Sequence, residues 1–387
     1  MELPGYFTIP ADHSVVRLAD ILETKQLEAD IASGLISDTR HPQIPNYHIL
    51  NYTHAATFSK EPWSECMEIC RGLIYDAESG IVIARPFRKF WNWADERHPE
   101  TLPVNLPTTV PTITDKLDGS LAIGYRAPNS DRVMVATRGS FTSDQAKAAN
   151  QWLQNNDIRI GWPLGWTPVF EWISPKNRIV VRYDEPELVA LALIRNRDGV
   201  EVNRDTFEKW SYSFRVRPVP LVATQEIERL AAEDRDDFEG YVAAWPRADR
   251  EPLRVKIKLS TYRRLHRILF TISEKSIWEA LVSGDSAAIM AMTADETLPK
   301  DVSCWVYQTL MRLWFDYSTK RKEIERVFES RPRGGDFGTL RKRYAEWVRQ
   351  TAPDKARALF GLLDVDQAVW EAVKPNSEPR FNSQDAE

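Results

Sequence analysis

The sequence predicts an α+β protein, in which antiparallel sheets with flanking helices are followed by an all-α C-terminal region. Two observations predict this. From residue 45 to 259, short runs rich in β-branched and aromatic residues alternate with turn residues, as strands and their connections do. From residue 261 to 373, apolar residues instead recur at helical spacing, as in Ile277, Ala280 and Leu281.

The change of pattern near residue 260 also gives the expected domain boundaries. We expect one domain at residues 1–259, including an N-terminal extension, and an α-helical domain at residues 260–374 with about five helices. The run 331–335 is rich in glycine, arginine and proline, so we expect a loop between two of those helices. The polar tail at residues 375–387 is expected to be disordered.

Within the first region, each expected strand is bounded by turn residues, as at 77–80 and 128–131. The expected strands are 72–76, 81–87, 120–126, 132–137, 168–173, 179–183, 188–195, 240–245 and 253–258. The clearest helix begins at about Ser143, a residue type favoured at helix N-caps, and runs to Leu153.

Composition excludes several classes of protein. The chain has 387 residues and a formal net charge of -5, so any site for a polyanion must be a local basic patch. The chain has three cysteines, Cys66, Cys70 and Cys304, which are too few for a disulfide framework and fit a reducing compartment. Because no full ligand quartet accompanies them, Cys66 and Cys70 are expected to be buried thiols rather than zinc ligands. No leader-like segment or membrane span is expected, which favours the cytoplasm, or the host cytoplasm if a phage encodes the chain.

The central motif is Lys116-Leu117-Asp118-Gly119-Ser120, just before an expected strand. A lysine, an aspartate and a glycine at these offsets arise by chance in roughly one chain in ten. Alone, the motif therefore indicates only a charged turn that opens a hairpin. The chain has no Gly-Lys dipeptide, which excludes a phosphate-binding loop of the Walker A type.

Four further charged residues support a functional interpretation. Glu171 lies within an aromatic strand, and Glu239 lies at the start of another. Lys256 and Lys258 are two residues apart, so on a strand both side chains point to one face, while their apolar neighbours point to the other. Such a strand fits the wall of an anionic pocket. The alternative is that the lysines are solvated and that the carboxylates are only their structural partners.

Taken together, these motifs resemble the phage-type RNA ligase 1 family, the tRNA-repair ligases of T-even phages. This family belongs to the covalent nucleotidyltransferase superfamily, with DNA ligases and mRNA capping enzymes. The resemblance extends over about residues 45–290, through segments that match the family in order and with similar spacing. These segments are 47–52, 70–72, 85–92, 116–121, 138–145, 170–183, 239–242 and 256–260.

The resemblance implies a nucleotidyltransferase domain of the ATP-grasp-like ligase type, in which Lys116 attacks the α-phosphate of ATP. It implies that Lys256 and Lys258 contact that phosphate and support activation of the lysine. Glu171 and Glu239 would act near the ribose and a metal ion, Mg²⁺ or Mn²⁺, directly or through water.

The resemblance also implies a site for the outer phosphates of ATP. Arg71, Lys89 and Arg138 would hold these phosphates, although the family has a lysine at the position of Arg138, so the contact geometry differs. The functionally sensitive positions of the family correspond here to Tyr52, Trp91 and Gly119.

Elementary chemistry gives a second expectation for Lys116. Its amine must be neutral to attack phosphorus, whereas the pKa of a lysine is ordinarily about 10.4. Neighbouring cations lower such a pKa, and we expect Arg71, Lys89, Lys256 and Lys258 to do so. Bound phosphates would raise it again, and a divalent metal held near Glu171 and Glu239 would offset that effect.

The resemblance further implies RNA ends as partners, with tRNA anticodon-loop breaks and an end-healing kinase-phosphatase as further candidates. A basic cluster in the helical region fits an RNA-backbone platform, but acidic residues among its members fit a solvated, salt-bridged helix surface equally well. The cluster consists of Lys320, Arg321, Lys322, Arg326, Arg331, Arg333, Arg341, Lys342, Arg343 and Arg349.

Two rival functions remain open. A DNA ligase or a capping guanylyltransferase would share the motifs, but those enzymes usually continue into a β-rich OB domain, whereas this sequence turns helical. A non-catalytic RNA-binding relative would have no need of a nucleophilic lysine with its activating cations. The sequence therefore favours an ATP-dependent RNA ligase.

Overall fold

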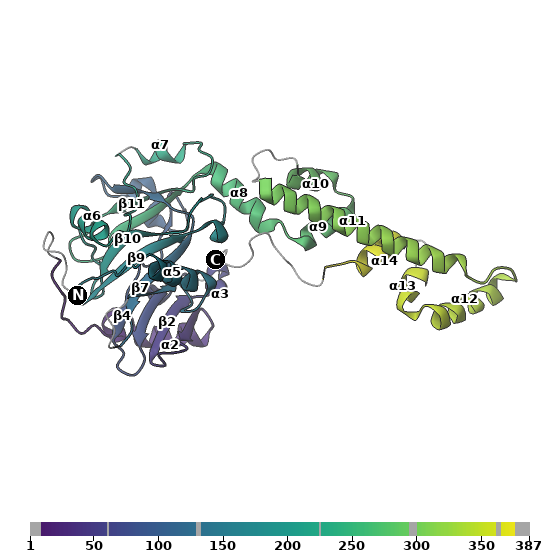
Figure 1. The fold of residues 1–387 in the computed structure, drawn as a ribbon, viewed down its shortest axis with the longest axis horizontal. Coiled ribbons are helices and arrows are strands. Elements are labelled where there is room, and N and C mark those ends of the chain that lie inside the picture. Colours follow the sequence, from purple (N-terminus) through teal and green to yellow (C-terminus); the bar gives the residue numbers. More distant parts are fainter. Residues whose placement is uncertain are drawn as a thin grey trace. The chain divides into compact units, whose positions relative to one another are not determined.

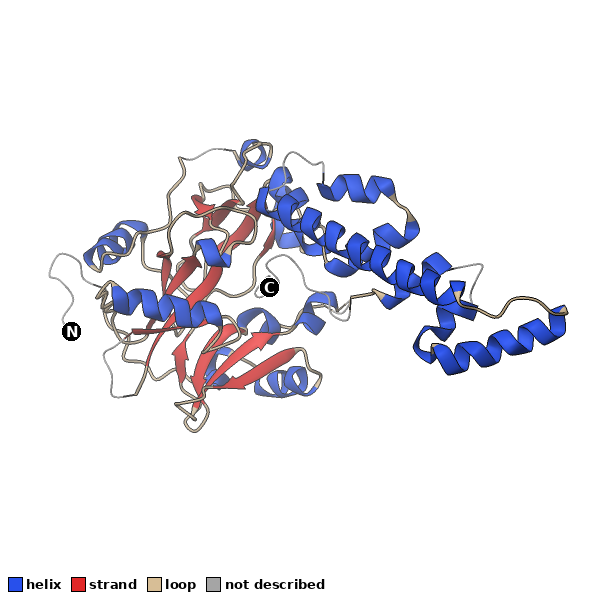
Figure 2. Cartoon of the chain, turned by 45° about the vertical axis from the view of Figure 1, so that its right-hand side comes forward, coloured by secondary structure: helices blue, strands red, loops and turns tan. Residues whose placement is uncertain are grey.

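The computed structural model describes residues 9–59, 62–128, 133–223, 226–293, 300–360 and 365–375. The chain forms two compact units, Met1–Arg263 and Arg264–Glu387 (Figure 1). The described part of the first unit contains three four-stranded sheets with helices around them, and that of the second is helical (Figure 2). The predicted α+β class with a helical C-terminal region is confirmed.

The first sheet has the order β1-β2-β3-β4 and is antiparallel throughout. Its strands are β1 (Ile36–Arg40), β2 (Tyr47–Tyr52), β3 (Arg71–Asp76) and β4 (Val82–Ala84). The short helices nearby are α1 (Leu18–Ile21), α2 (Thr24–Ala32), α3 (His54–Phe58) and α4 (Glu65–Ile69). Buried residues of α2, α4 and the strands form one apolar core, in which Cys66 and Cys70 are the expected buried free thiols.

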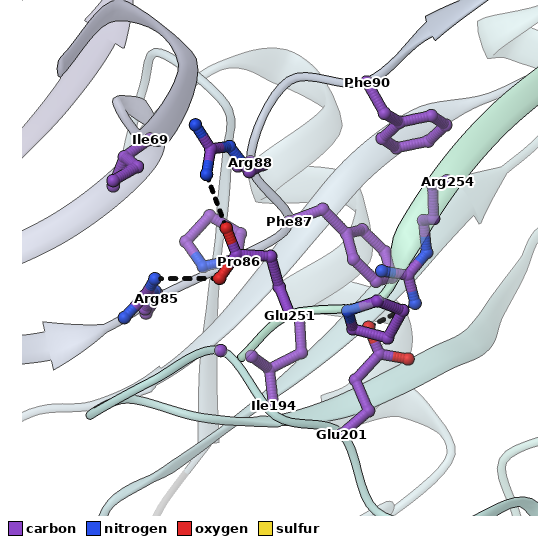
Figure 3. Close-up of a pocket in the computed structure, with 12 residues that line it drawn as sticks. Ile69, Arg85, Pro86, Phe87, Arg88, Phe90, Ile194, Glu201, Glu251 and Arg254 are labelled. Carbon is purple, nitrogen blue, oxygen red and sulfur yellow. Dashed lines mark hydrogen bonds and ion pairs between the residues drawn. The ribbon is translucent and has the colours of Figure 1, made fainter. Parts of the chain in front are cut away.

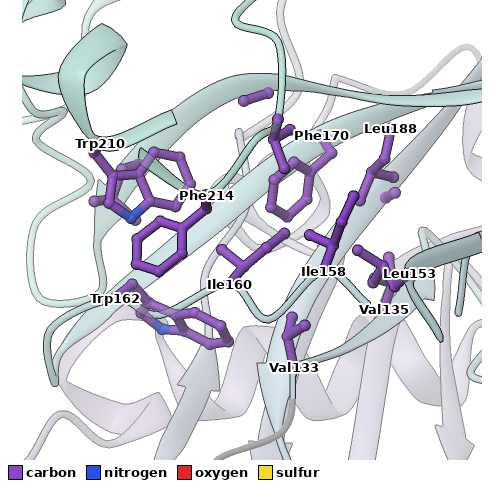
Figure 4. Close-up of a cluster of buried hydrophobic side chains, with 14 of the residues drawn as sticks. Val133, Val135, Leu153, Ile158, Ile160, Trp162, Phe170, Leu188, Trp210 and Phe214 are labelled. Atoms are coloured by element: carbon purple, nitrogen blue, oxygen red, sulfur yellow. The ribbon is translucent and has the colours of Figure 1, made fainter. Parts of the chain in front are cut away.

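The second sheet has the order β10-β9-β7-β8 and is also antiparallel. Its strands are β7 (Ser120–Arg126), β8 (Val133–Thr137), β9 (Trp166–Ile173) and β10 (Glu187–Arg195). Helices α5 (Asp144–Asn155) and α6 (Arg204–Ser213) pack on it, and Ser143 caps α5 as predicted. The core between the helices and the sheet is rich in aromatic side chains, and Trp210 is fully buried near Phe170 (Figure 4). The Trp210 indole donates to the Gly161 carbonyl at 2.8 Å.

The third sheet carries the central motif. Its order is β5-β12-β11-β6, with β5 parallel to β12 and the other pairs antiparallel. The strands are β5 (Trp91–Asn92), β6 (Thr112–Lys116), β11 (Gly240–Trp245) and β12 (Leu253–Lys258), and α7 (Ile227–Ala231) packs beside the last two. The single-turn helices η1 (Pro99–Thr101), η2 (Pro103–Asn105) and η3 (Pro175–Asn177) lie in connections.

Two strand predictions need correction. Residues 179–183 form no strand although all of them are described, because the amides of Val180 and Val181 donate to the Asp118 carboxylate instead of to a neighbouring strand. The strand expected at 81–87 is shortened to β4, and Pro86 has no amide hydrogen with which to extend its pairing. Residues 129–132 of the expected hairpin lie outside the described residues.

The helical region begins with α8 (Ser260–Thr271), α9 (Glu274–Ser283) and α10 (Ser286–Thr293). It continues with α11 (Lys300–Glu329), α12 (Phe337–Thr351), η4 (Pro353–Lys355), α13 (Ala356–Phe360) and α14 (Val365–Ala372). The described part therefore has seven α-helices from residue 260 onward, more than the five or so expected, because several of them are short.

Within the second unit, the ring of Tyr317 stacks on that of Trp370 at 4.2 Å between centroids, and the Trp278 indole donates to the Trp370 carbonyl at 2.8 Å. The loop predicted at 331–335 does separate α11 from α12. Residues 376–387 of the expected disordered tail lie outside the described residues. No helix in the described ranges has the length and apolar character needed to cross a membrane.

Candidate active site

Lys116 is the last residue of β6, and strand pairing brings it close to two other charged positions. In the register of the sheet, Gly240 of β11 lies between Lys116 of β6 and Lys258 of β12. Glu239 directly precedes Gly240, so its carboxylate lies at the same end of the sheet. The strand that follows Lys116 agrees with the sequence pattern, whereas β6 before it is not among the strands predicted from that pattern.

The Glu239 carboxylate bridges the two lysines. One oxygen lies 2.7 Å from Lys116 Nζ, and the other lies 2.9 Å from Lys258 Nζ. The Glu239 side chain is only 2% exposed, whereas those of Lys116 and Lys258 are 22% and 25% exposed. Gly240 permits this close packing, because it has a φ of +143° and a Cβ there would lie 2.0 Å from the Ile257 carbonyl oxygen.

This bridge corrects the expectation for the pKa of Lys116. Burial lowers that pKa, but the nearby carboxylates of Glu239 and Glu171 outweigh burial, so the pKa is raised above its ordinary value. Burial conversely raises the pKa of Glu239, and Lys116 and Lys258 outweigh it, so that pKa is lowered. The amine is therefore held as an ammonium ion in the protein without ligands.

Glu171 lies on β9, on the other side of the motif. Its Oε1 accepts a hydrogen bond from the Gly119 amide at 3.1 Å. A Cβ at Gly119 would lie 2.4 Å from the Trp172 carbonyl oxygen, so only glycine allows this approach. Burial raises the pKa of Glu171 to about 7, although Lys116 lowers it. Glu171 is thus a second carboxylate close to the Lys116 amine.

Asp118 belongs to the central motif, and its role in the site becomes visible only in the fold. Its carboxylate is 2% exposed and accepts hydrogen bonds from the amides of Val180 and Val181 at 2.7 and 2.8 Å, and from the Tyr262 hydroxyl at 2.7 Å. Its own amide donates to the Tyr183 hydroxyl at 2.9 Å. These bonds fix the turn that follows Lys116. The aspartate of the motif was the available signal, but its partners lie far along the chain.

Three cations surround the hydroxyl of Tyr52, which is 5% exposed on β2. Lys89 Nζ lies 3.2 Å from that oxygen, and the guanidinium of Arg138 donates to it at short range. Arg71 also interacts with it and carries a buried Nη1 atom that has no hydrogen-bond partner among the described residues. The structure therefore brings together the residues that sequence reasoning assigned to the outer phosphates.

Aromatic rings enclose Lys89. Its Nζ lies 4.5 Å from the ring centre of Tyr52, 4.9 Å from that of Trp63 and 5.0 Å from that of Trp91. Cation–π attraction of this kind favours one position of the ammonium group. Trp91 was expected here, whereas Trp63 was not, because it lies outside the motifs and only the fold brings it close.

Lys256 lies between the two groups of charges. Burial, followed by the positive charges of Lys89, Arg71, Lys116 and Lys258, lowers its pKa well below the ordinary value. Its strand alternates as predicted: Val255, Ile257 and Leu259 are buried, whereas Lys256 and Lys258 are partly exposed. A bound anion would strongly stabilise the charged form of an amine that is surrounded by so many positive groups.

The residues present fit both a triphosphate and a divalent cation. The positive groups around Tyr52 and Lys256, together with the orphaned atom of Arg71, suit phosphate oxygens. In the part of the chain that the structure describes, no group of three or more His, Cys, Asp and Glu side chains forms a metal cage. Glu171 and Glu239 instead suit an ion such as Mg²⁺, which is usually held by one or two carboxylates together with phosphate oxygens and water.

Comparison with known proteins decides the family. Residues 69–262 match a family model described as RNA ligase. The match covers half of the chain and all the site residues except Tyr52 and Trp63. The chain belongs to the RNA ligase family. This match confirms the resemblance to phage-type RNA ligases, and the relatives of the chain include phage proteins.

Two relatives and one solved structure illustrate the similarity. A protein of Thermovibrio ammonificans, named as a candidate RNA ligase, is 32% identical over 203 residues, 51% of this chain and 52% of that protein. The RNA ligase of Rhodothermus phage RM378 is 24% identical over 374 residues, 78% and 79% of the two chains. An archaeal ATP-dependent RNA ligase structure is 13% identical, with a TM-score of 0.44 over 86% and 87% of the two chains. The chain thus spans about half the length of the Thermovibrio relative.

The geometry around Tyr52 predicts a low phenol pKa. Burial raises that pKa, but Arg138, Arg71 and Lys89 together lower it to about 8. A lowered pKa means that the tyrosinate form stabilises the folded protein; this contribution grows as the pH rises from about 8 towards 10 and is absent at lower pH. We expect a tyrosinate absorbance step near pH 8 that disappears in Tyr52→Phe.

Tyr75→Phe is the matched control, because burial and Asp38 raise the pKa of Tyr75 and its loss should leave the step near pH 8 intact. Unfolding measurements should also show that Tyr52→Phe loses up to about 2–3 kcal/mol relative to the unaltered protein at high pH, and less at pH 7. Identical absorbance titrations of the unaltered protein and Tyr52→Phe between pH 7 and 9 would contradict this arrangement of charges.

Proposed function

We propose that this chain is an ATP-dependent RNA ligase that joins a 5′-phosphate to a 3′-hydroxyl through AMP bound covalently to Lys116. One observation carries the proposal: a single lysine amine at the end of β6 lies 2.7 Å from a buried carboxylate, next to a group of cations suited to phosphates. A charged turn that merely opened a hairpin would need neither the carboxylate nor the cations.

In the first step, the Lys116 amine loses a proton and attacks the α-phosphorus of ATP. A nitrogen–phosphorus bond forms, the bond to the β-phosphate oxygen breaks, and pyrophosphate leaves. Lys256 and Lys258 stabilise the charge on the α-phosphate as it crowds in the transition state. Arg71, Lys89 and Arg138 hold the β- and γ-phosphates and therefore orient the leaving group.

The raised pKa of Lys116 is the obstacle to this step. The Lys116 ammonium group must lose a proton, and its ion pair with Glu239 opposes that loss. The positive charges of Lys256 and Lys258 favour it. A divalent metal ion held by Glu171 and Glu239, directly or through water, would supply positive charge that favours the neutral amine. We therefore infer that Mg²⁺ or Mn²⁺ is required.

In the second step, an oxygen of an RNA 5′-phosphate attacks the phosphorus of the AMP, the bond to Lys116 breaks, and a 5′-adenylylated RNA end forms. In the third, the RNA 3′-hydroxyl attacks the 5′-phosphorus, AMP leaves, and a phosphodiester is made. The partners are thus RNA ends, with breaks in tRNA anticodon loops and an end-healing kinase-phosphatase as part of the same proposal.

Lys116 provides the direct test. Incubation with ATP and Mg²⁺ should add one AMP to the chain by mass spectrometry, on the peptide that contains Lys116, and Lys116→Ala should abolish the addition. Glu239→Ala should impair it strongly, because it removes the carboxylate that positions Lys116 and Lys258. Labelled GTP in place of ATP tests for a capping enzyme. No adduct on folded protein, or an adduct on another side chain, would sink the proposal.

The helical region provides a test of RNA binding. Arg341 and Lys342 are exposed on α12, whereas Lys320 and Arg321 of α11 pair with Glu323 and Glu325. Neutralising Arg341, Lys342 and Arg343 together should weaken RNA binding and reduce the slope of log K against log salt by up to about 2, at roughly 0.7 per lost phosphate contact.

A matched control neutralises the exposed residues Lys147, Arg159 and Lys209, which removes the same charge from the first unit instead of from α12. Equal salt slopes for the two triple variants, or an unchanged slope for the α12 variant, would remove the RNA platform and leave a solvated helix surface.

A further inference from the structure

Arg88 and Lys89 are neighbours in the segment that joins β4 to β5, but their side chains reach different partners. Lys89 reaches the Tyr52 hydroxyl in the group of outer-phosphate residues. Arg88 donates to Glu68 Oε2 at 2.6 Å and to Glu251 Oε1 at 2.5 Å. Whatever fixes Arg88 therefore also fixes the backbone from which Lys89 extends.

The segment has no strand ladder, and its other contacts are made by individual groups. The Arg85 guanidinium donates to the Asn196 and Arg197 carbonyls at 3.1 Å, and Phe87 packs against a buried apolar cluster. Residues 85–90 are all described and lie outside any strand. The Lys89 amide donates to the Glu68 carbonyl at 2.6 Å, and the Arg85 amide donates to the Thr167 hydroxyl at 2.9 Å. Without a strand ladder, the side chains of the segment must contribute much of its positional order.

Glu251 ties this segment to the third sheet (Figure 3). It lies in the connection between β11 and β12, just before the strand that carries Lys256 and Lys258. Its two oxygens face two arginines of the segment, Arg88 at 2.5 Å and Arg85 at 3.6 Å. Strand β12 keeps its own six-residue ladder with β11, so loss of Glu251 should disturb the segment rather than the strand.

This group of charges is a support and not a ligand site. The space that its side chains enclose is about 20 Å³, which is room for one water molecule. The Glu251 and Arg88 side chains are 18% and 30% exposed, so the ion pair is partly desolvated. Removing one partner would leave the other charge partly buried and without this ion pair, which costs free energy. A second ion pair, between Arg254 and Glu201, lines the same space.

We propose that Arg88 and Glu251 are positioning residues for Lys89, and that they act selectively on the step that uses the outer phosphates of ATP. The inference rests on the proposed function. Lys89 is needed when pyrophosphate leaves, whereas an RNA end that already carries AMP has no β- or γ-phosphate of ATP to hold. Measuring the two half-reactions separately therefore distinguishes a positioning role of Arg88 and Glu251 from a general loss of stability.

The test measures both half-reactions in Glu251→Gln. The ATP concentration that gives half the maximal rate of Lys116 adenylylation should rise about tenfold. Sealing of RNA that carries a chemically prepared 5′-adenylate should stay within about twofold of the unaltered protein. Arg88→Gln should weaken the response to ATP in the same way. Arg88→Lys keeps the positive charge and should retain part of the response that Arg88→Gln loses.

Glu201→Gln is the matched control, because Glu201 is 19% exposed, lines the same space and pairs with Arg254 of β12 rather than with Arg85 or Arg88. Its ATP response should be unchanged. The inference fails if Glu201→Gln and Glu251→Gln behave alike, if both half-reactions fall together, or if neither changes. Absence of any adenylylation in the unaltered protein would instead refute the proposed function, and this inference with it.

Discussion

The carboxylate of Glu239 joins two lysine amines from different strands, and the remainder of the site is arranged around that bridge. A carboxylate that is 2% exposed would be costly to bury alone, and Lys116 and Lys258 offset that cost by direct ion pairs. The same contacts raise the pKa of Lys116. The Lys116 amine is thus held as an ammonium ion, and the proposed attack on ATP would require positive charge to be brought to the carboxylate.

The fold supplies rigidity on both sides of that bridge. The register of β6, β11 and β12 places Lys116, Gly240 and Lys258 in one row, and Asp118 fixes the following turn through four hydrogen bonds. Of the residues proposed to hold the outer phosphates, Arg71 begins β3 and pairs with β2, but Lys89 lies outside any strand. Lys89 depends on the aromatic rings around it and on the ion pairs of Arg88, which makes it the part of the site most open to adjustment.

The local sequence pattern predicted many features of the fold and the site, and the features that it missed share one cause. The alternation around Lys256 and Lys258 correctly gave one basic and one buried face, and most of the strands and the Ser143 cap were found. Residues 179–183 look like a strand because they are β-branched, but their amides serve Asp118, which is some 60 positions away in the chain. Trp63, Tyr262 and the sign of the pKa shift of Lys116 likewise depend on tertiary neighbours that no local pattern contains.

The most direct test of the Glu239 bridge is the pKa of the Lys116 amine itself. It can be measured from the pH dependence of amine labelling at Lys116, followed on its own peptide by mass spectrometry in the protein without nucleotide or metal. The account predicts a pKa above the ordinary lysine value in the unaltered protein and a lower pKa in Glu239→Gln, which lacks the negative charge of the bridge. An ordinary or lowered pKa in the unaltered protein, or no change in Glu239→Gln, would contradict it.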